Sequence, residues 1–260
     1  MQLKNVIINK VDGVTVIRLN RPKDFNSLNF ELIGDMCKAL EFCTDDIETK
    51  VVVITGEGKA FCAGGDVSLF RDGDVGDTLR QLIKAMNPVI IGIRRMPKPV
   101  IAMLNGVTAA GGMSLAAACD LRICSSSVKF KQAYTAWGLV PDAGWSILVP
   151  LLVGFGKASE MVYIDSPFGA IEALEFGFVT KVVDDDKLEK TTMDIARKIA
   201  EGPSVTYALT KENLNSALFS LLERQLELEK VGMTAVGRTE DLKEGMTAFA
   251  QKRKPVFVGR

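Results

Sequence analysis

Two glycine-containing segments hold residue types that could bind an oxyanion through the main chain. Segment 59–66 reads Lys-Ala-Phe-Cys-Ala-Gly-Gly-Asp, and segment 105–114 begins with Asn-Gly and contains Gly111-Gly112. Glycine lets the backbone approach a ligand closely, and a helix that begins at Gly112 would add its partial positive charge to the N–H of Gly111. Neither segment is a dinucleotide-binding or P-loop motif, and glycine pairs mark turns more often than sites. The local pattern alone therefore favours plain turns.

The ionisable residues restrict the possible chemistry. The chain of 260 residues contains no histidine, which excludes Ser-His-Asp and Cys-His relays and the His-Glu-x-x-His zinc site. Acid and base catalysis must then come from carboxylates, Tyr, Lys or Cys, and we expect no metal. The five cysteines form no C-x-x-C pair, and the sequence shows no secretory leader, so we expect reduced, mostly buried thiols in a cytoplasmic protein.

The charge and hydropathy patterns argue against nucleic-acid and membrane partners. Lys and Arg balance Asp and Glu at 32 each, so the chain lacks the broad positive field that attracts nucleic acid or an anionic membrane. Residues 99–119 carry no charge until Asp120, but Asn105-Gly106 and Gly111-Gly112 interrupt the stretch. It therefore predicts a strand, a turn and a buried helix instead of a membrane span.

The elements that position these segments follow from periodicity. Residues 5–10 and 14–20 are β-branched and apolar, and Asp12-Gly13 between them predicts a hairpin. Asn29 precedes apolar residues at helical spacing, which predicts a capped helix that ends before Asp45-Asp46.

Two continuous apolar runs, 51–55 and 100–104, predict fully buried strands, each followed by one of the glycine segments. This alternation predicts an α/β fold with function in the loops. After Lys187 the periodicity is helical, so we divide the chain into a core domain, 1–190, and a C-terminal helical region, 191–260. A wide leucine face there would pack on the core or on another subunit.

Over essentially its full length the chain resembles the crotonase, or enoyl-CoA hydratase/isomerase, superfamily. In the first half the resemblance is carried by Arg21-Pro22, Asn26-Ser27-Leu28, Phe61-Cys62-Ala63-Gly64-Gly65-Asp66, Lys98-Pro99-Val100-Ile101-Ala102, Asn105-Gly106, Gly111-Gly112 and Cys119-Asp120. In the second half it is carried by Leu139-Val140-Pro141-Asp142-Ala143-Gly144, Glu172-Ala173-Leu174, Gly177, Ala248-Phe249 and Lys252-Arg253-Lys254-Pro255. The resemblance implies a crotonase-type ββα spiral core with a C-terminal helical trimerisation part, assembled as a homotrimer or a dimer of trimers.

The resemblance also implies an acyl-CoA thioester substrate and two main-chain oxyanion donors, which match Gly65 and Gly111 here. Two preset N–H donors stabilise the negative charge that develops on a thioester oxygen when a neighbouring carbon loses a proton. Family hydratases use two glutamates, and those positions match Ser114 and Tyr134. Neither can replace a carboxylate, so hydration by that route is not expected.

A double-bond shift needs only one base, and Asp142 is the candidate that the resemblance suggests. An aspartate follows the proline at this position in the epoxyphenylacetyl-CoA isomerase branch, which the C-terminal sequence also resembles most. Pro-Asp-Ala-Gly is equally a plain turn sequence, and Asp is a common helix cap. Apolar neighbours such as Leu139 and Trp145 are expected to raise the pKa of Asp142 by desolvation.

For CoA and the acyl group, the resemblance suggests a set of binding residues: Phe25, Asn26, Ala63, Asp66, Val67, Tyr134 and Lys254. Tyr134 could also be a buried tyrosine without contact to substrate. Lys254 and its basic neighbours would meet the CoA phosphates from an adjacent subunit, or form a solvated tail. No separate cofactor is expected, because CoA is part of the substrate.

The sequence thus predicts an acyl-CoA isomerase that shifts a double bond, or rearranges a ring, through an enolate. Two alternatives stay open. One is an enoyl-CoA hydratase, lyase or hydrolase that acts on an unusual acyl-CoA, with Asp142 activating water. The other is a non-catalytic acyl-CoA-binding homologue that lost the glutamates.

Overall fold

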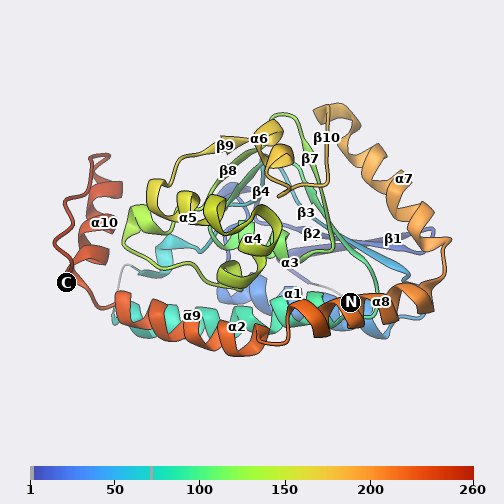
Figure 1. Cartoon of the computed structure of the whole chain (residues 1–260), viewed down its shortest axis with the longest axis horizontal. Coiled ribbons are helices and arrows are strands. Elements are labelled where there is room, and N and C mark those ends of the chain that lie inside the picture. The colour runs from blue at the N-terminus through green and yellow to red at the C-terminus, as the bar shows by residue number, and fades with distance from the viewer. Residues whose placement is uncertain (1–2, 71–72) are drawn as a thin grey trace.

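A six-stranded sheet forms the centre of the molecule. The structure, a computed structural model, describes residues 3–70 and 73–260 (Figure 1). The sheet has the order β1 (Val6–Val11), β2 (Val14–Leu19), β3 (Val51–Gly56), β5 (Val100–Leu104), β7 (Leu121–Ser125) and β10 (Lys181–Val183). The predicted hairpin is confirmed, since β1 and β2 pair antiparallel, and the other neighbours pair parallel.

A smaller sheet makes the chain turn repeatedly in a spiral. It consists of β4 (Ala60–Cys62), β6 (Val107–Ala109), β8 (Lys129–Lys131) and β9 (Phe168–Gly169), of which β4, β6 and β8 are parallel. The strands β3, β5 and β7 lead into β4, β6 and β8 in turn. Parallel strands end at one edge of a sheet, so the segments that follow β4 and β6 meet there.

Helices cover both faces of the large sheet, as its continuous apolar strands require. Along β3, Val52 and Ile54 face the main core, whereas Val51 and Val53 face a second cluster that includes Leu188 of α7. The helices on the main-core side include α1 (Phe30–Asp45), α2 (Val75–Arg95) and α3 (Gly111–Ala118). The opposite face is covered by α7 (Leu188–Ala200). The α/β prediction is therefore confirmed.

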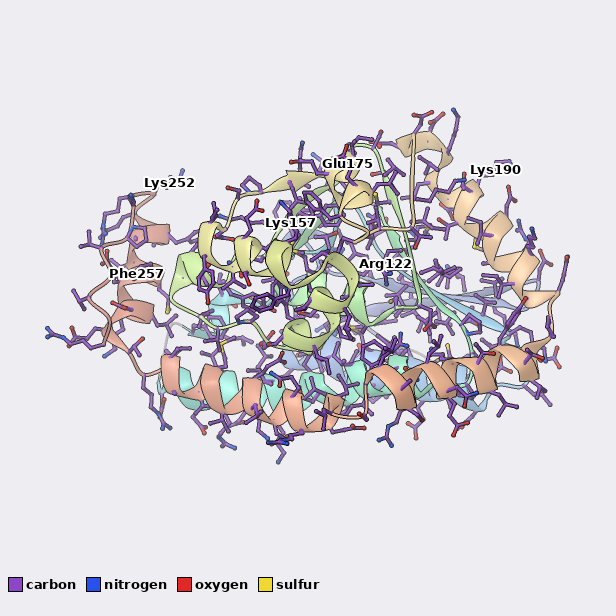
Figure 2. The ribbon with its side chains drawn as sticks, viewed as in Figure 1. Arg122, Lys157, Glu175, Lys190, Lys252 and Phe257 are labelled. Atoms are coloured by element: carbon purple, nitrogen blue, oxygen red, sulfur yellow. The ribbon has the colours of Figure 1, made fainter. Side chains whose placement is uncertain are left out.

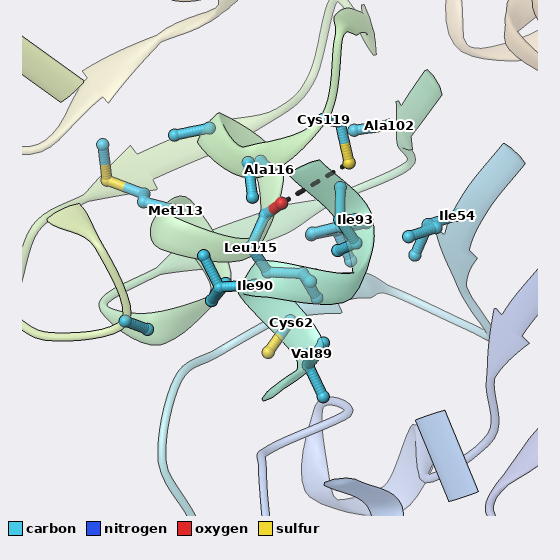
Figure 3. Packing of buried hydrophobic residues seen from close by; sticks show 14 of the residues in the cluster. Ile54, Cys62, Val89, Ile90, Ile93, Ala102, Met113, Leu115, Ala116 and Cys119 are labelled. Atoms are coloured by element: carbon cyan, nitrogen blue, oxygen red, sulfur yellow. Dashed lines mark hydrogen bonds between the residues drawn. The ribbon is translucent and has the colours of Figure 1, made fainter. Parts of the chain in front are cut away.

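The helix α1 begins where the sequence predicts. The side chain of Asn29 accepts a hydrogen bond from the N–H of Leu32 and so caps the helix. The helix α2 packs on α3 through fully buried aliphatic side chains, among them Val89, Ile90 and Ile93 against Leu115 (Figure 3). This contact holds α3, whose first residue is Gly111, against the core.

Further helices, several of them short 3-10 turns, connect the elements described above. They are η1 (Pro22–Asp24), η2 (Val67–Phe70), η3 (Thr135–Trp137), α4 (Trp145–Val153), α5 (Phe155–Ile164), α6 (Ala170–Glu175) and η4 (Asp185–Lys187). No helix in the described ranges, 3–70 and 73–260, is long and apolar enough to cross a membrane.

The C-terminal region is helical, with α8 (Ser204–Leu218), α9 (Leu222–Val236) and α10 (Glu240–Ala250). The helix α9 runs alongside α2, and α10 stands at one end of the molecule (Figure 1). The leucine face divides, because Leu222 and Leu226 are buried in the core while Leu218 and Leu228 are exposed. The proposed division at residue 190 falls inside α7 and stays a prediction.

Charged side chains lie both at the surface and in the interior of the molecule. Lys190 on α7 and Lys252 after α10 point outward at opposite ends of the molecule (Figure 2). Arg122, in contrast, is buried, and its guanidinium donates to the carbonyl oxygens of Phe178 and Cys119. Of the five cysteines, four are buried and Cys37 is partly buried, as predicted.

Candidate active site

A cavity of about 530 Å³ lies where the ends of β4 and β6 meet. Its walls include the predicted residues Phe25, Ala63, Gly65, Asp66, Val67, Gly111, Tyr134 and Asp142. Its apolar part is lined by Leu28, Ile33, Phe70, Leu79, Leu82, Ile83, Met86, Trp137, Leu139, Met233 and Phe249. The volume and the mainly apolar lining are typical of small-molecule sites.

The first glycine loop leaves the N–H of Gly65 available to a ligand. A bridge to Leu28 fixes the loop: the N–H of Leu28 donates to the carbonyl of Gly64 over 2.7 Å, and the N–H of Asp66 donates to the carbonyl of Leu28 over 2.9 Å. Among the described residues, no protein acceptor receives the N–H of Gly65. Because Gly65 lines the cavity, this N–H is a candidate donor to a bound oxygen.

The second loop presents the N–H of Gly111 in the same way. Ala110 has φ 45° and ψ −123°, a conformation that alanine rarely adopts, and it turns the chain into α3. Gly111 is the first residue of α3, so its N–H has no partner within the helix and lies at the positive end of the helix dipole.

The two loops touch, and glycine is what allows the contact. A Cβ atom at Gly64 would lie 2.8 Å from the Cβ of Ala110 and 3.5 Å from the nitrogen of Gly111. A Cβ atom at Gly112 would lie 2.1 Å from the carbonyl oxygen of Cys62, far inside any allowed contact. The structure therefore brings the predicted residues Gly65 and Gly111 to one cavity, where each N–H is a candidate donor to a bound oxygen.

Asp142 lies in the same cavity and is held by a small polar network. The hydroxyl of Tyr134 donates to Asp142 Oδ1 over 2.7 Å, and Ser114 Oγ donates to the Asp142 carbonyl over 2.8 Å. The hydroxyls of Ser114 and Tyr134 are 3.3 Å apart. These are the two positions at which family hydratases are expected to carry glutamates, so here they support Asp142 instead.

The surroundings of Asp142 favour its protonated form. Burial raises the pKa of Asp142 to about 7, the Tyr134 hydroxyl partly opposes this, and the negative charge of Glu229 adds to it. Burial also raises the pKa of Tyr134 well above its usual value, and the nearby Asp142 charge adds to that effect. Tyr134 therefore stays a neutral hydrogen-bond donor, while Asp142 can both accept and return a proton near neutral pH.

Two other carboxylates line the cavity, Asp24 and Asp66, but both pair with Arg21. Burial raises the pKa of Asp66, yet hydrogen bonds from Ser68 and from Arg21 outweigh it and lower the pKa overall. Of the described carboxylates that line the cavity, only Asp142 has no cationic partner.

Asn26 does not line the cavity. Its side chain is fully buried and donates to the carbonyls of Glu57 and Ala60 over 2.9 and 2.8 Å, while its oxygen accepts from the N–H of Arg21. Asn26 and Phe25 both have left-handed backbone angles, with φ 55° and 51°. The structure thus places Asn26 behind the wall as a support for the loop that carries Phe25.

Lys254 also lies outside the lining of the cavity and is exposed. The helix before it does reach the site, because Phe249 of α10 contacts Trp137 with ring centroids 4.5 Å apart, and both side chains line the cavity. A contact between Lys254 and a CoA phosphate stays a prediction.

Glu229 also belongs to the surroundings of Asp142 and was not predicted from the sequence. This residue on α9 is only 4 % exposed, and its carboxylate accepts hydrogen bonds from Gly144 and Ser146, directly after Asp142. One signal could have revealed it: Leu222, Leu226, Glu229 and Met233 follow helical spacing, which places a carboxylate on a buried helix face.

Comparisons with known proteins agree with this geometry. The sequence pattern of the family described as Enoyl-CoA hydratase/isomerase matches residues 9–260. The chain is 35% identical over 251 residues to a 1,2-epoxyphenylacetyl-CoA isomerase of Escherichia coli, covering 95% of this chain and 96% of the relative. It is also 35% identical to a short-chain-enoyl-CoA hydratase of Clostridium acetobutylicum, with 98% and 97% covered.

A solved structure agrees as well. The crystal structure of an enoyl-CoA hydratase from Mycobacterium avium subsp. paratuberculosis superimposes with a TM-score of 0.90 at 33% identity, covering 99% of this chain and all of that one. The spiral fold, the paired glycine loops and these matches lead to one conclusion: the chain belongs to the enoyl-CoA hydratase/isomerase family.

Proposed function

We propose that this enzyme is an acyl-CoA isomerase that moves a double bond, or rearranges a ring, in an enoyl-CoA thioester. The relatives named above include both an isomerase and a hydratase, so the family alone leaves the reaction open. The observation that carries the proposal is Asp142, the carboxylate of the cavity that faces no cation and whose pKa is raised to about 7.

The proposed reaction needs one proton transfer in each direction. The carboxylate of Asp142 removes a proton from a carbon next to the double bond, and the electron pair moves onto the thioester oxygen as an enolate. The N–H groups of Gly65 and Gly111 stabilise this oxygen, each by about 3 kcal/mol in comparable sites. Asp142 then returns the proton to a different carbon, which completes the shift.

The substrate contacts follow from the lining of the cavity. We propose that the acyl group occupies the apolar part between α2 and Met233, and that CoA crosses the loops that carry Phe25, Ala63, Asp66 and Val67. The chain itself supplies the oxyanion donors and the acid/base group, so we propose a reaction that needs no separate cofactor.

A solvent-isotope experiment tests the reaction type. The enzyme is incubated with a 3-enoyl-CoA in heavy water, and the product is analysed by mass spectrometry and NMR. An isomerase yields the 2-enoyl-CoA, with deuterium at carbon to the extent that the Asp142 proton exchanges. Addition of oxygen instead of a double-bond shift would contradict the proposal and establish a hydratase.

The substitution Asp142→Asn tests the acid/base role. Loss of a general acid/base group lowers turnover by about 10²- to 10⁴-fold. Affinity for a CoA thioester should change little, because the N–H donors and the CoA contacts lie on other segments. A wild-type enzyme that binds thioesters but turns over none would instead indicate the non-catalytic homologue.

We propose assembly into a homotrimer or a dimer of trimers, and the apolar surface supports an association of subunits. Large apolar side chains are exposed on α4 to α6 and on α8 and α9: Leu151, Phe155, Tyr163, Ile164, Ile171, Leu209, Leu214, Leu218, Leu221, Leu228 and Val231. Exposed apolar surface of this extent is typical of subunit interfaces. Light scattering coupled to size-exclusion chromatography distinguishes the trimer, the hexamer and the monomer.

A further inference from the structure

Glu229 is a buried carboxylate that does not reach the cavity. It binds the first residues of α4 instead. Its Oε2 accepts the N–H of Gly144 over 2.7 Å, and its Oε1 accepts the N–H and hydroxyl of Ser146 over 2.9 and 2.6 Å. Within the part of the chain that the structure describes, no Lys or Arg forms an ion pair with it. A buried charge is costly unless it is hydrogen-bonded. Burial raises the pKa of Glu229, and the three hydrogen bonds from Ser146 and Gly144 oppose this shift.

The carboxylate replaces a cap that α4 lacks. The N-cap residue of α4 is Gly144, which has no side chain to accept the free N–H groups of the first turn. Glu229 supplies those acceptors from a helix far along the sequence, and its charge lies at the positive end of the α4 dipole. The link therefore joins the C-terminal region to the loop that holds Asp142.

That loop needs external support. Ala143 and Gly144, which directly follow Asp142, both have left-handed backbone angles, with φ 54° and 82°. Alanine in this region costs about 1–2 kcal/mol and persists only where the surroundings hold it. Ser114 and the N–H of Trp145 hold the Asp142 carbonyl on one side of this turn, and Glu229 holds the other side.

We propose that Glu229 is a positioning residue for the reaction, which fixes the Ala143-Gly144 turn and so directs the Asp142 carboxyl into the cavity. Glu229 itself does not line the cavity and does not contact the proposed substrate. The inference rests on the proposed function, because it assigns to Asp142 the acid/base role.

The charge of Glu229 gives this role a signature that a purely structural cap would lack. The polar groups that face Asp142 are the hydroxyls of Tyr134 and Ser114 and the carboxylate of Glu229. Burial is the main cause that raises the pKa of Asp142, and the Glu229 charge raises it further. Removal of that charge should therefore lower the pKa of Asp142.

Two substitutions separate position from charge. Glu229→Gln removes the charge. It also replaces one carboxylate oxygen by an NH₂ group, which cannot accept a hydrogen bond from the N–H groups of Gly144 and Ser146. We expect kcat to fall by about 100-fold, as for a displacement of about 1 Å, and the acidic limb of the pH–rate profile to move to lower pH. Glu229→Asp keeps the charge but is too short, so kcat should fall while the limb stays in place.

The matched control is Glu227→Gln, on the same helix. Glu227 is exposed and pairs with Lys230, so its loss should leave kcat, KM and the pH profile unchanged. In the Glu229 variants the affinity for a non-reactive acyl-CoA should also stay unchanged, since the CoA contacts lie on other loops. Circular dichroism and thermal unfolding establish which variants are folded.

An infrared titration tests the inference without turnover. The carboxyl band of Asp142 is identified in the difference between wild type and Asp142→Asn, and its intensity is followed against pH in each background. If Asp142→Asn keeps full turnover, the proposed function is wrong, while the titration still reports on Glu229. If a folded Glu229→Gln titrates and turns over like wild type, the inference is overturned.

A milder variant serves if Glu229→Gln does not fold. Ser146→Ala removes one of the three donors to Glu229 and changes a residue that is exposed. One hydrogen bond of this kind is worth about 1 kcal/mol, so kcat should fall about fivefold. An unchanged kcat in this variant would count against the positioning role.

Discussion

The two halves of the candidate site are built in different ways. On one side, Gly65 and Gly111 offer main-chain N–H groups, and close backbone contacts between two loops fix their positions. On the other side, three side chains hold Asp142. Tyr134 donates to its carboxyl group and Ser114 donates to its carbonyl oxygen, while Glu229 accepts from the N–H of Gly144 two residues later. The difference teaches that backbone contacts of the fold fix the two candidate oxyanion donors, whereas replaceable side chains fix the candidate acid/base group.

The largest effect on stability and turnover is expected from a methyl group added where the two glycine loops are in backbone contact. In Gly112→Ala the new Cβ would meet the Cys62 carbonyl oxygen at 2.1 Å, so β4 and α3 must separate. We expect a loss of about 1–3 kcal/mol or more in the free energy of unfolding, together with loss of turnover. Denaturant unfolding and kinetics of the same preparation measure both.

The control for that change is Gly34→Ala, in the middle of α1. A Cβ there meets nothing within 4 Å, and alanine favours the helix, so stability should rise by about 0.5–1 kcal/mol. If Gly112→Ala were as well tolerated as this variant, close backbone contact would not be what fixes the oxyanion side.

In the half of the site that is built from side chains, ionised Asp142 should lower the free energy of unfolding. The pKa of Asp142 is raised from 3.8 to about 7 in the folded state, so the folded protein binds more protons than the unfolded chain between these values. The stability contribution of Asp142 therefore falls as the pH rises from about 4 to 7. Asn does not titrate, so the stability of Asp142→Asn relative to wild type should rise by about 4 kcal/mol between pH 4 and pH 8, at about 1.4 kcal/mol per unit of the pKa change.

Thermal unfolding of both proteins across this pH range measures the difference. If the difference in stability between wild type and Asp142→Asn does not change with pH, the pKa of Asp142 is the same in the folded and unfolded states. The two halves of the site would then not differ in their electrostatics.

A smaller effect is expected at Tyr134. Tyr134→Phe removes the hydroxyl that donates to Asp142 Oδ1 and that lowers its pKa, so the acidic limb of the pH–rate profile should move to higher pH. The loss of one hydrogen bond to a charged group corresponds to about 10-fold in kcat. A limb that moves to lower pH would contradict the assignment of Tyr134 as a donor.

The smallest effect is expected at the rim. Phe249 of α10 is 62 % exposed and contacts Trp137 beside the cavity. Phe249→Ala should raise KM severalfold, because about 1 kcal/mol of aromatic contact is lost, and leave kcat nearly unchanged. A large fall in kcat would show that α10 takes part in placing Asp142 and not only in covering the substrate.

Local signals predicted much of the fold. The Asp12-Gly13 hairpin, the Asn29 cap and the buried strands 51–55 and 100–104 are all present, because each depends on neighbouring residues. The alternation of strand, glycine segment and helix predicted a helix after each glycine segment, and α2 and α3 are these helices, but the bounds of α2 were not predicted. Pro88 lies inside it, and its role in the core depends on contacts with α1, α3 and α9 that no local pattern shows.

The site divides in the same manner. The cavity brings together the residues of both glycine loops and Asp142, as the resemblance to the family suggested. The sequence suggested Asn26 as a binding residue and did not suggest Glu229 at all. The partners of both side chains are distant in the sequence: Asn26 binds the backbone of Glu57 and Ala60, and Glu229 binds Gly144 and Ser146. Such contacts follow from the folded arrangement, and sequence spacing does not encode them.

The position of Glu229 late in the chain has a consequence for biosynthesis. Both glycine loops leave the ribosome long before α9 does, so the candidate oxyanion donors are synthesised well before the residue that we propose to position Asp142. We expect chains released before α9 to form the loops but to hold Asp142 poorly. The order of synthesis would thus delay reactivity until the polypeptide is nearly finished.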